Sequence, residues 1–293
     1  YKGIANGQPF YDASHIARCA LNPPTMQTDK YKIERARTPK KVAVIGGGIG
    51  GMEAAIVFAK RGHTVDLYEK TDHLGGVFIA AAAPSFKEKD KMLIAWYERE
   101  IKKYPITLHL NTEVNGIETL QVDEVIVATG AKAKKLPVAG AEYAMDAVEY
   151  LLGEKEVGEN VTIVGGGLTG CEIAYDLYQQ GKKPTIVEMK NDLIAVKGVC
   201  LANSSYLRDF FTTNHVPVHL ETKLSEIHPD GVTVTDKAGK SFKIEADSVI
   251  LSVGYDPAPA AAEGKHVHVI GDAKAVGNLR TVIWNAWDVA MRI

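Results

Sequence analysis

The sequence predicts an α/β fold made of two similar units, each built on a parallel β-sheet. The first observation is an internal repeat: KVAVIGGGIGGMEAAIVFAKRGHTVDLYEK at 41–70 returns as VTIVGGGLTGCEIAYDLYQQGKKPTIVEMK at 161–190, with Val42 aligned to Val161 at an offset of 119 residues. The second is the order within each copy, which runs apolar segment, glycine-rich turn, helical pattern, apolar segment. The third is that the apolar segments are rich in Val and Ile without polar alternation, as in parallel strands buried on both faces.

Size and composition limit the classes of function. The 293 residues suffice for two or three compact units, and 34 Lys and Arg nearly balance 36 Asp and Glu, which argues against a nucleic-acid partner. No apolar run approaches the ~20 residues that span a bilayer, so no membrane partner is expected. Three cysteines, odd in number and far apart, favour a reducing cytoplasm over a disulfide scaffold. The oligomeric state stays open, a homo-oligomer included.

The first unit follows a polar, irregular segment at 1–39, which reads as a linker. The elements expected next are a strand at 41–45, a helix at 51–61 and a strand at 64–69. Residues 85–104 carry apolar and aromatic side chains at helical spacing. The segment DEVIVATGA (123–131) reads as a buried strand that ends in a tight turn.

The second unit starts near Glu159 and repeats the order strand, glycine turn, helix, strand. A further helix and several short strands follow, and DSVILSVG (247–254) echoes the segment at 123–130. The tail HVHVIGDAKAVGNLRTVIWNAWDVAMRI supplies one strand, a Gly-Asp turn and a last helix. His266 and His268 alternate on that strand and should face one side of the sheet; with no third ligand visible, they are expected to be surface histidines rather than a metal site.

The first glycine turn carries the G-x-G-x-x-G spacing of Gly46, Gly48 and Gly51. The first glycine permits the sharp turn, the second lets the backbone approach a pyrophosphate, and the third lets the helix pack closely on the strand. A diphosphate then sits at the helix N-terminus, where free N–H groups and the helix dipole favour an anion. Glu69, at the end of the next strand, is placed to accept hydrogen bonds from ribose hydroxyls.

The second copy has Gly165, Gly167 and Gly170, and Glu188 stands where Glu69 stands in the first. Two complete copies in order predict two dinucleotide sites, although one copy could keep the shape and have lost its ligand. A 2′-phosphate would be repelled by the carboxylate of Glu188, and no Arg follows it in VEMKNDL. The sequence therefore favours NADH over NADPH.

The motifs VAVIGGGIGGMEAA, VDLYEKTDHLGG, VIVATGA and VHVIGDA together resemble the glutathione-reductase-like flavoproteins, in which two Rossmann-like dinucleotide-binding domains occur and the second is inserted into the first. The resemblance implies an FAD domain at 40–152 plus 255–293 and an NADH domain at 153–254. It also implies further FAD contacts, which are Gly75, Gly76, Ala128, Thr129, Gly130, Gly271 and Asp272. Members of this fold that reduce disulfides carry a cysteine pair beside the flavin, and this sequence has no C-x-x-C or C-x4-C pair.

The segment RCALNP (18–23) resembles the end of the iron–sulfur segment in the Old Yellow Enzyme-like reductases, the group of 2,4-dienoyl-CoA reductase, enoate reductase and trimethylamine dehydrogenase. In that group an FMN-binding barrel and a four-cysteine [4Fe–4S] segment precede the FAD and NAD(P)H domains. Cys19 would then be the last of four ligands. No other cysteine lies within residues 1–18, and Tyr1 is not an initiator Met, so we expect a longer parent or a segment that has lost its cluster. On the residues alone, a lone cysteine is equally a small buried side chain.

These expectations combine into an NADH-oxidising flavoprotein module. Hydride would pass from NADH to FAD, and by the resemblance electrons would continue through a [4Fe–4S] cluster and FMN to reduce an activated C=C bond. Orientation of the two ligands is the main task of the protein, and no acid–base catalytic residue is expected for that step. Two alternatives stand beside it: a self-sufficient NADH-dependent reductase of an electron carrier, and a non-catalytic domain that holds ADP as a structural ligand.

Overall fold

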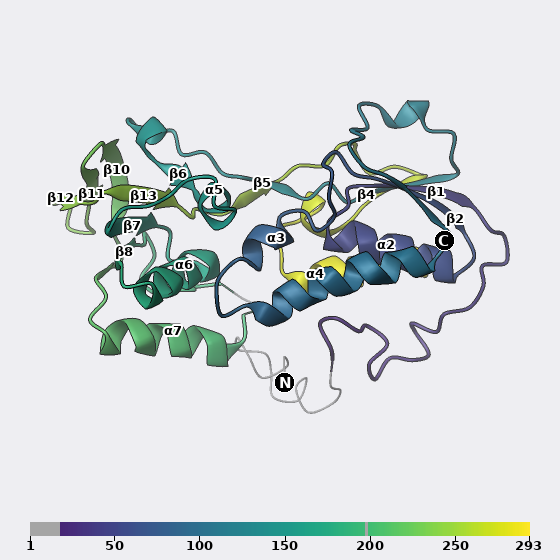
Figure 1. Cartoon of the computed structure of the whole chain (residues 1–293), viewed down its shortest axis with the longest axis horizontal. Helices are drawn as coiled ribbons and strands as arrows, with labels where there is room; N and C mark the ends of the chain where they lie inside the picture. Colours follow the sequence, from purple (N-terminus) through teal and green to yellow (C-terminus); the bar gives the residue numbers. More distant parts are fainter. Residues whose placement is uncertain (1–17, 197–198) are drawn as a thin grey trace.

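The structure is a computed structural model that describes residues 18–196 and 199–293. Two units, each built around a five-stranded parallel sheet, are joined by a narrow two-stranded ribbon (Figure 1). The predicted α/β class with two similar units is confirmed. Within the described part of the chain, no helix combines the length and the apolar character needed to cross a bilayer.

The first unit has the strand order β15-β4-β1-β2-β3. Its strands are β1 (Lys41–Ile45), β2 (Thr64–Tyr68), β3 (Ile106–His109), β4 (Glu124–Val127) and β15 (Val267–Val269). Its helices are α2 (Ile49–Lys60), α3 (Phe78–Ala81), α4 (Glu88–Glu100) and α8 (Leu279–Ala290), with short 3₁₀ turns at Ile101–Lys103, Ile117–Thr119 and Gly271–Ala273. Helix α2 is buried from Ile49 to Phe58 because the sheet, α4 and α8 enclose it, which explains why its sequence is apolar all round.

The second unit has the strand order β6-β13-β7-β8-β9. Its parallel strands are β6 (Met145–Asp146), β7 (Asn160–Val164), β8 (Lys183–Val187), β9 (Val218–His219) and β13 (Ser248–Leu251). Its helices are α5 (Ala147–Leu151), α6 (Leu168–Gln179) and α7 (Leu201–Thr213), with a 3₁₀ turn at Ala141–Tyr143. A separate antiparallel sheet contains β10 (Lys223–His228), β11 (Gly231–Thr235) and β12 (Ser241–Glu245). Because β6 pairs with β13, the second sheet takes its edge strand from before residue 153.

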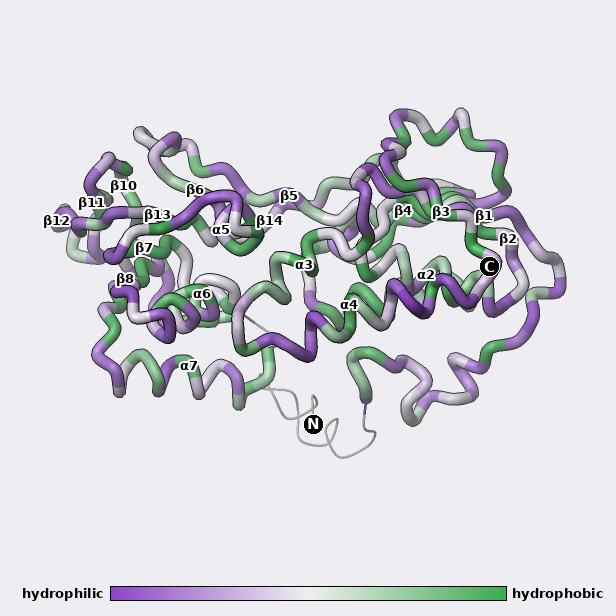
Figure 2. Tube along the Cα trace, in the orientation of Figure 1, coloured by the Kyte–Doolittle hydropathy of each residue, from purple (hydrophilic) through white to green (hydrophobic). Residues whose placement is uncertain are grey.

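Hydrophobic residues concentrate on the inner strands and α2, whereas α7 alternates between hydrophobic and hydrophilic positions (Figure 2). This contrast fits a helix enclosed on several sides and a helix that covers one face of a sheet. The predicted helix at 85–104 begins at Glu88, ends at Glu100 and continues as one 3₁₀ turn. Strand β3 was not predicted from the sequence: only Ile106 and Leu108 of its four residues are apolar, and none of the four is fully buried.

The ribbon between the units consists of β5 (Ala131–Ala133) and β14 (Tyr255–Pro257), which pair in antiparallel fashion. The chain therefore leaves the first unit once and returns to it once, as an inserted unit requires. The Thr129 hydroxyl stabilises this crossing, because it donates to the Ala258 carbonyl at 2.8 Å and accepts from the Ala260 amide at 3.1 Å.

The described part of the N-terminal segment packs on α8. Tyr31 is 1% exposed and contacts the rings of Trp284 and Trp287 edge to face. Its hydroxyl donates to Asp288 at 2.8 Å. The Trp284 indole donates to the Cys19 carbonyl at 3.0 Å, so the segment is attached to the first unit at both ends.

Candidate dinucleotide sites

The predicted site residues of the first unit lie at one edge of its sheet. Strands β1, β2, β4 and β15 are parallel, so their carboxyl ends meet at this edge. Gly46, Glu69 and Ala128 directly follow β1, β2 and β4, and Gly271 follows β15 after one residue. Open α/β sheets bind ligands at this position.

The three glycines of the first turn have different surroundings, which can be compared with the roles expected from their spacing. Gly46 has φ +106°, and a Cβ there would stand 2.5 Å from the Ala128 carbonyl oxygen. A Cβ at Gly51 would stand 1.8 Å from the Gly46 carbonyl oxygen, so only glycine lets α2 begin this close to the strand. A Cβ at Gly48 would have no heavy atom within 4 Å. Gly48 therefore leaves open space at the N-terminus of α2, where a pyrophosphate could approach the backbone.

Glu69 is tied to the same turn. Its Oε2 accepts from the Gly47 amide at 2.7 Å, and its Oε1 accepts from the Thr71 amide at 2.8 Å and hydroxyl at 2.9 Å. The carboxylate is 7% exposed yet keeps acceptor capacity on both oxygens. Its orientation is thus set before any ligand binds.

Gly75 and Gly76 lie against the glycine turn. The Gly75 amide donates to the Gly47 carbonyl at 2.9 Å, and Gly75 forms a parallel bridge with Gly48. Both glycines have positive φ, +118° and +56°. A Cβ at Gly76 would stand 3.2 Å from the Gly48 Cα, so this pair needs glycine to approach the turn.

The remaining predicted residues of the first site are Ala128–Gly130 and the Gly271–Asp272 pair. Ala128 touches the glycine turn, whereas Thr129 and Gly130 turn into the ribbon. Gly271 has φ +59° and faces Val282 of α8, which also faces Gly50. Burial raises the pKa of Asp272, against the hydrogen bond that its carboxylate accepts from the Gly277 amide at 3.0 Å. Among the hydrogen bonds of the described residues, none joins Asp272 to the glycine turn, so the two share only the sheet edge.

The second unit repeats this geometry. Gly165 has φ +113°, a Cβ at Gly170 would stand 2.0 Å from the Gly165 carbonyl oxygen, and a Cβ at Gly167 would meet nothing within 4 Å. Glu188 accepts from the Gly166 amide at 2.6 Å and from the Lys190 amide at 2.8 Å. The Lys190 ammonium group itself donates to the Ala195 carbonyl at 3.4 Å, so it does not pair with Glu188.

Two features of the sites went unrecognised in the sequence. Ser252 stands in the second unit where Ala128 stands in the first, since a Cβ at Gly165 would lie 2.2 Å from its carbonyl oxygen. The echo between 123–130 and 247–254 was the available signal for it.

The second feature is a repeated H-L-x-T motif, at 109–112 and 219–222. In each copy the amide of the site glutamate donates to the histidine carbonyl, and its carbonyl accepts from the threonine amide, at 2.9–3.0 Å. The motif fixes the strand end that carries the acid. The two copies of this motif are separated by a different number of residues than the two copies of the main repeat. An alignment of the main repeat therefore does not bring them into register.

The surroundings of the cysteines and of two histidines bear on the chemistry expected of them. Cys19, Cys171 and Cys200 are unpaired. Burial raises the pKa of the Cys171 thiol to about 12, so it is packed and unreactive at neutral pH. His266 and His268 both contact the buried carboxylate of Glu124, at 3.3 and 2.9 Å, which confirms that they face one side of the sheet. Among residues 18–196 and 199–293, no cluster of three His, Cys, Asp or Glu side chains is arranged to hold a metal.

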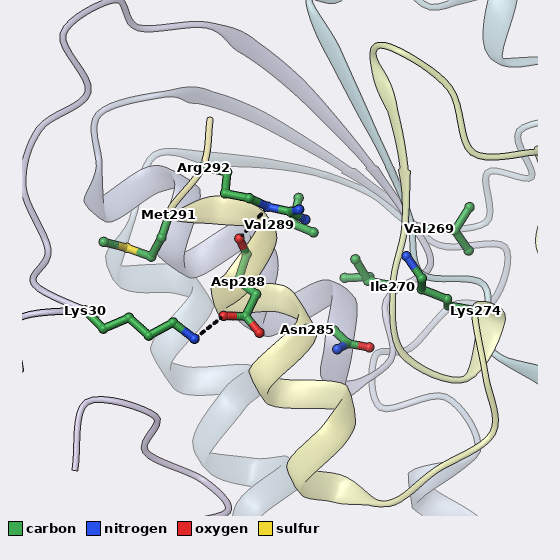
Figure 3. Close-up of a pocket in the computed structure, with 9 residues that line it drawn as sticks. All are labelled: Lys30, Val269, Ile270, Lys274, Asn285, Asp288, Val289, Met291 and Arg292. Carbon is green, nitrogen blue, oxygen red and sulfur yellow. Dashed lines mark hydrogen bonds and ion pairs between the residues drawn. The ribbon is translucent and has the colours of Figure 1, made fainter. Parts of the chain in front are cut away.

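A cavity of about 510 Å³ lies between β15, α8 and Lys30 (Figure 3). None of the predicted site residues lines it. Its charged rim includes Lys274 and Arg292, and Lys30 is paired with Asp288 at 3.0 Å. The cavity is therefore separate from both glycine turns.

Comparison with known proteins agrees with this geometry. Cinnamate reductase of Clostridium sporogenes is 38% identical over 283 residues, covering 94% of this chain and 42% of that protein. NADH oxidase of Thermoanaerobacter brockii is 36% identical over 306 residues, covering 99% of this chain and 46% of that protein. A solved structure of 2-naphthoyl-CoA reductase superposes with a TM-score of 0.85 at 29% identity, covering 94% of this chain and 43% of that one. The chain thus spans less than half the length of each of these three proteins.

The model of the pyridine nucleotide-disulphide oxidoreductases matches residues 24–122 and 115–290. These two matches include both glycine turns and both site glutamates. The chain belongs to the pyridine nucleotide-disulphide oxidoreductase family, whose members are oxidoreductases that bind FAD and a pyridine nucleotide.

Proposed function

We propose that this chain is an NADH-oxidising flavoprotein module, with FAD on the first glycine turn and NADH on the second. The main support for the proposal is that the same geometry occurs twice. Gly48 and Gly167 each leave open space at a helix N-terminus, and beside each lies a buried glutamate that is oriented by a hydrogen bond from the turn. Bound FAD would supply an acceptor for the hydride of NADH and could release the electrons singly. The cysteine pair needed for disulfide chemistry is absent from the sequence.

The residues of the chain have the task of binding and orientation. Gly46, Gly48, Gly51, Gly75 and Gly76 would leave room for the FAD pyrophosphate, and Glu69 would hold its ribose. Ala128, Thr129, Gly130, Gly271 and Asp272 would line the rest of the FAD site. Gly165, Gly167, Gly170 and Glu188 would hold NADH, with Glu188 disfavouring a 2′-phosphate. Half-buried Asp272, whose pKa is raised by burial, would contact a ligand hydroxyl.

We extend the proposal to the longer protein of which such chains form part. Electrons would leave the FAD toward a [4Fe–4S] segment that includes Cys19, then to an FMN barrel that reduces an activated C=C bond. Two relatives named for the reduction of unsaturated substrates, cinnamate reductase and 2-naphthoyl-CoA reductase, support this extension. Three unpaired cysteines support a reducing, cytoplasmic setting.

An anaerobic NADH titration of the chain loaded with FAD, followed by visible absorbance, tests the proposal. We expect the flavin absorbance to bleach at one NADH per FAD and to respond far less to NADPH. A protein that binds ADP, takes up no flavin and ignores NADH would contradict the proposal and favour a structural nucleotide domain. Rapid turnover of the isolated chain with a soluble electron carrier would instead favour a self-sufficient reductase.

A further inference from the structure

Besides the ribbon, the two units touch where α3 packs on α5 and at one further place. Ser85 of the first unit donates to the Asp176 carboxylate from its hydroxyl at 2.6 Å and from its amide at 3.1 Å. Two residues on, the Lys87 ammonium group donates to Glu172 at 2.6 Å. Both acids lie on α6, one turn apart, so the short segment contacts one face of that helix. We call Ser85, Lys87, Glu172 and Asp176 the interdomain clamp.

The clamp is shielded from water more than surface ion pairs are. The Lys87 and Glu172 side chains are 16% and 15% exposed, and Asp176 is 7% exposed. Burial raises the pKa of Glu172, against the attraction of Lys87. Phe86, between the two donors, contacts the Tyr175 ring edge to face at 5.1 Å. Loss of one partner would leave a charge in a poorly hydrated place, so the clamp resists opening.

The clamp lies on two chain segments that each follow a predicted dinucleotide site. The segment that contains Ser85 and Lys87 comes from Gly75–Gly76 through α3, and it enters α4 at Glu88. Helix α6, which carries the two acids, begins at the Gly167 turn of the second site. In Figure 1 this segment reaches across from the first unit to α6, apart from the ribbon β5–β14.

A two-stranded ribbon alone leaves rotation between units open, because hinge segments absorb changes of φ and ψ. A second attachment away from the ribbon removes that freedom. We propose that the interdomain clamp fixes the angle between the units and holds the Gly167 turn toward the Gly48 turn, so that Lys87 and Glu172 are positioning residues for hydride transfer. The catalytic part of this inference rests on the proposed function, whereas the orientation does not.

Distance measurement between spin labels tests the orientation. Nitroxides at Arg99→Cys on α4 and Asp209→Cys on α7, with Cys19 and Cys200 changed to Ser, report the angle between units. We expect one narrow distance distribution when Lys87 is unchanged, and a broad or shifted distribution in Lys87→Glu. The charge swap Lys87→Glu with Glu172→Lys should restore the narrow distribution. The matched control is Lys103→Glu, which breaks a 2.6 Å pair with Glu100 inside the first unit and should leave the distribution unchanged.

Stopped-flow bleaching of the flavin adds the functional readout. We expect Lys87→Glu to slow the reduction of FAD at saturating NADH at least tenfold, with the Kd for NADH little changed, and the charge swap to recover most of the rate. Ser85→Ala, a milder change, should give an intermediate effect. An unchanged distance distribution in Lys87→Glu would overturn the inference. If the unsubstituted chain failed to reduce its flavin, the proposed function would be overturned instead, and the distance result would still stand.

Discussion

The carboxylate of Glu188 accepts a hydrogen bond from the backbone amide of Gly166 at 2.6 Å, within the second glycine turn. The same bond joins Glu69 to Gly47 in the first unit at 2.7 Å. Each acid is therefore both part of the turn and a candidate ribose ligand. A ligand that binds there meets a carboxylate whose rotamer is already fixed, which lowers the entropy cost of binding.

Glu188→Gln should weaken NADH binding by roughly 10- to 100-fold, because charge-assisted hydrogen bonds contribute about 1.5–3 kcal/mol. The preference for NADH over NADPH should shrink, since the repulsion of a 2′-phosphate disappears. Calorimetric titration with both nucleotides measures the two effects. Glu69→Gln is the matched control: it should lower FAD retention and leave NADH affinity of the second unit unchanged. Equal effects of both variants on both ligands would contradict the assignment of one ligand to each copy.

Two glycines of the second turn should respond in opposite ways to alanine. Gly167 has φ −70° and open space around its missing Cβ, so Gly167→Ala should fold normally and lose NADH affinity by tenfold or more. A Cβ at Gly170 would stand 2.0 Å from a backbone oxygen, so Gly170→Ala should destabilise the unit by about 1–3 kcal/mol. Thermal unfolding and NADH titration separate the two results. A Gly167→Ala protein with parental NADH affinity would show that no phosphate approaches this turn.

The repeat made much of this molecule predictable. Glycine has a conformational reason to stand at Gly46, Gly51, Gly165 and Gly170, so the turn, the helix start and the sheet edge follow from spacing alone. Strand β3 was missed because it is short and only two of its residues are apolar; its parallel pairing with β2 defines it. The interdomain clamp was also invisible. Ser85 and Asp176 are 91 residues apart and belong to no periodic pattern, so only the packed chain brings them together.

Acid should unfold the first unit partly through Glu124. Burial by itself would raise the pKa of this carboxyl, but hydrogen bonds from Lys40, His268 and His266 outweigh it and hold the pKa at about 2. Because the folded pKa lies below the ordinary glutamate value of 4.5, the stabilisation is present above about pH 4.5 and is lost as the pH falls toward 2. Glu124→Gln should remove on the order of 1–3 kcal/mol of stability at pH 6 and less at pH 3.

Urea unfolding at several pH values measures that difference. Glu263→Gln, which removes an exposed partner of Lys274, is the control and should change stability little at either pH. A constant loss from pH 3 to pH 6 in Glu124→Gln would mean that the charge of Glu124 contributes nothing.

Glu53 should give the opposite pH dependence. It is 7% exposed, and burial raises its pKa against hydrogen bonds from the Trp287 indole at 2.5 Å and the Tyr97 hydroxyl at 2.8 Å. Because the pKa of Glu53 is higher in the folded state than in the unfolded state, stability is lost as the pH rises from the unfolded-state pKa toward the folded-state pKa. Trp287→Phe removes one donor to the carboxylate, so it should cost about 1–3 kcal/mol near neutral pH and less near pH 5, where more of Glu53 is protonated. Trp284→Phe is the matched change, because that indole donates to the uncharged Cys19 carbonyl. The loss of free energy of unfolding in Trp284→Phe, measured in urea, should be the same at both pH values. If the losses in the two tryptophan variants changed with pH in parallel, ionised Glu53 would be ruled out as the cause of the pH dependence.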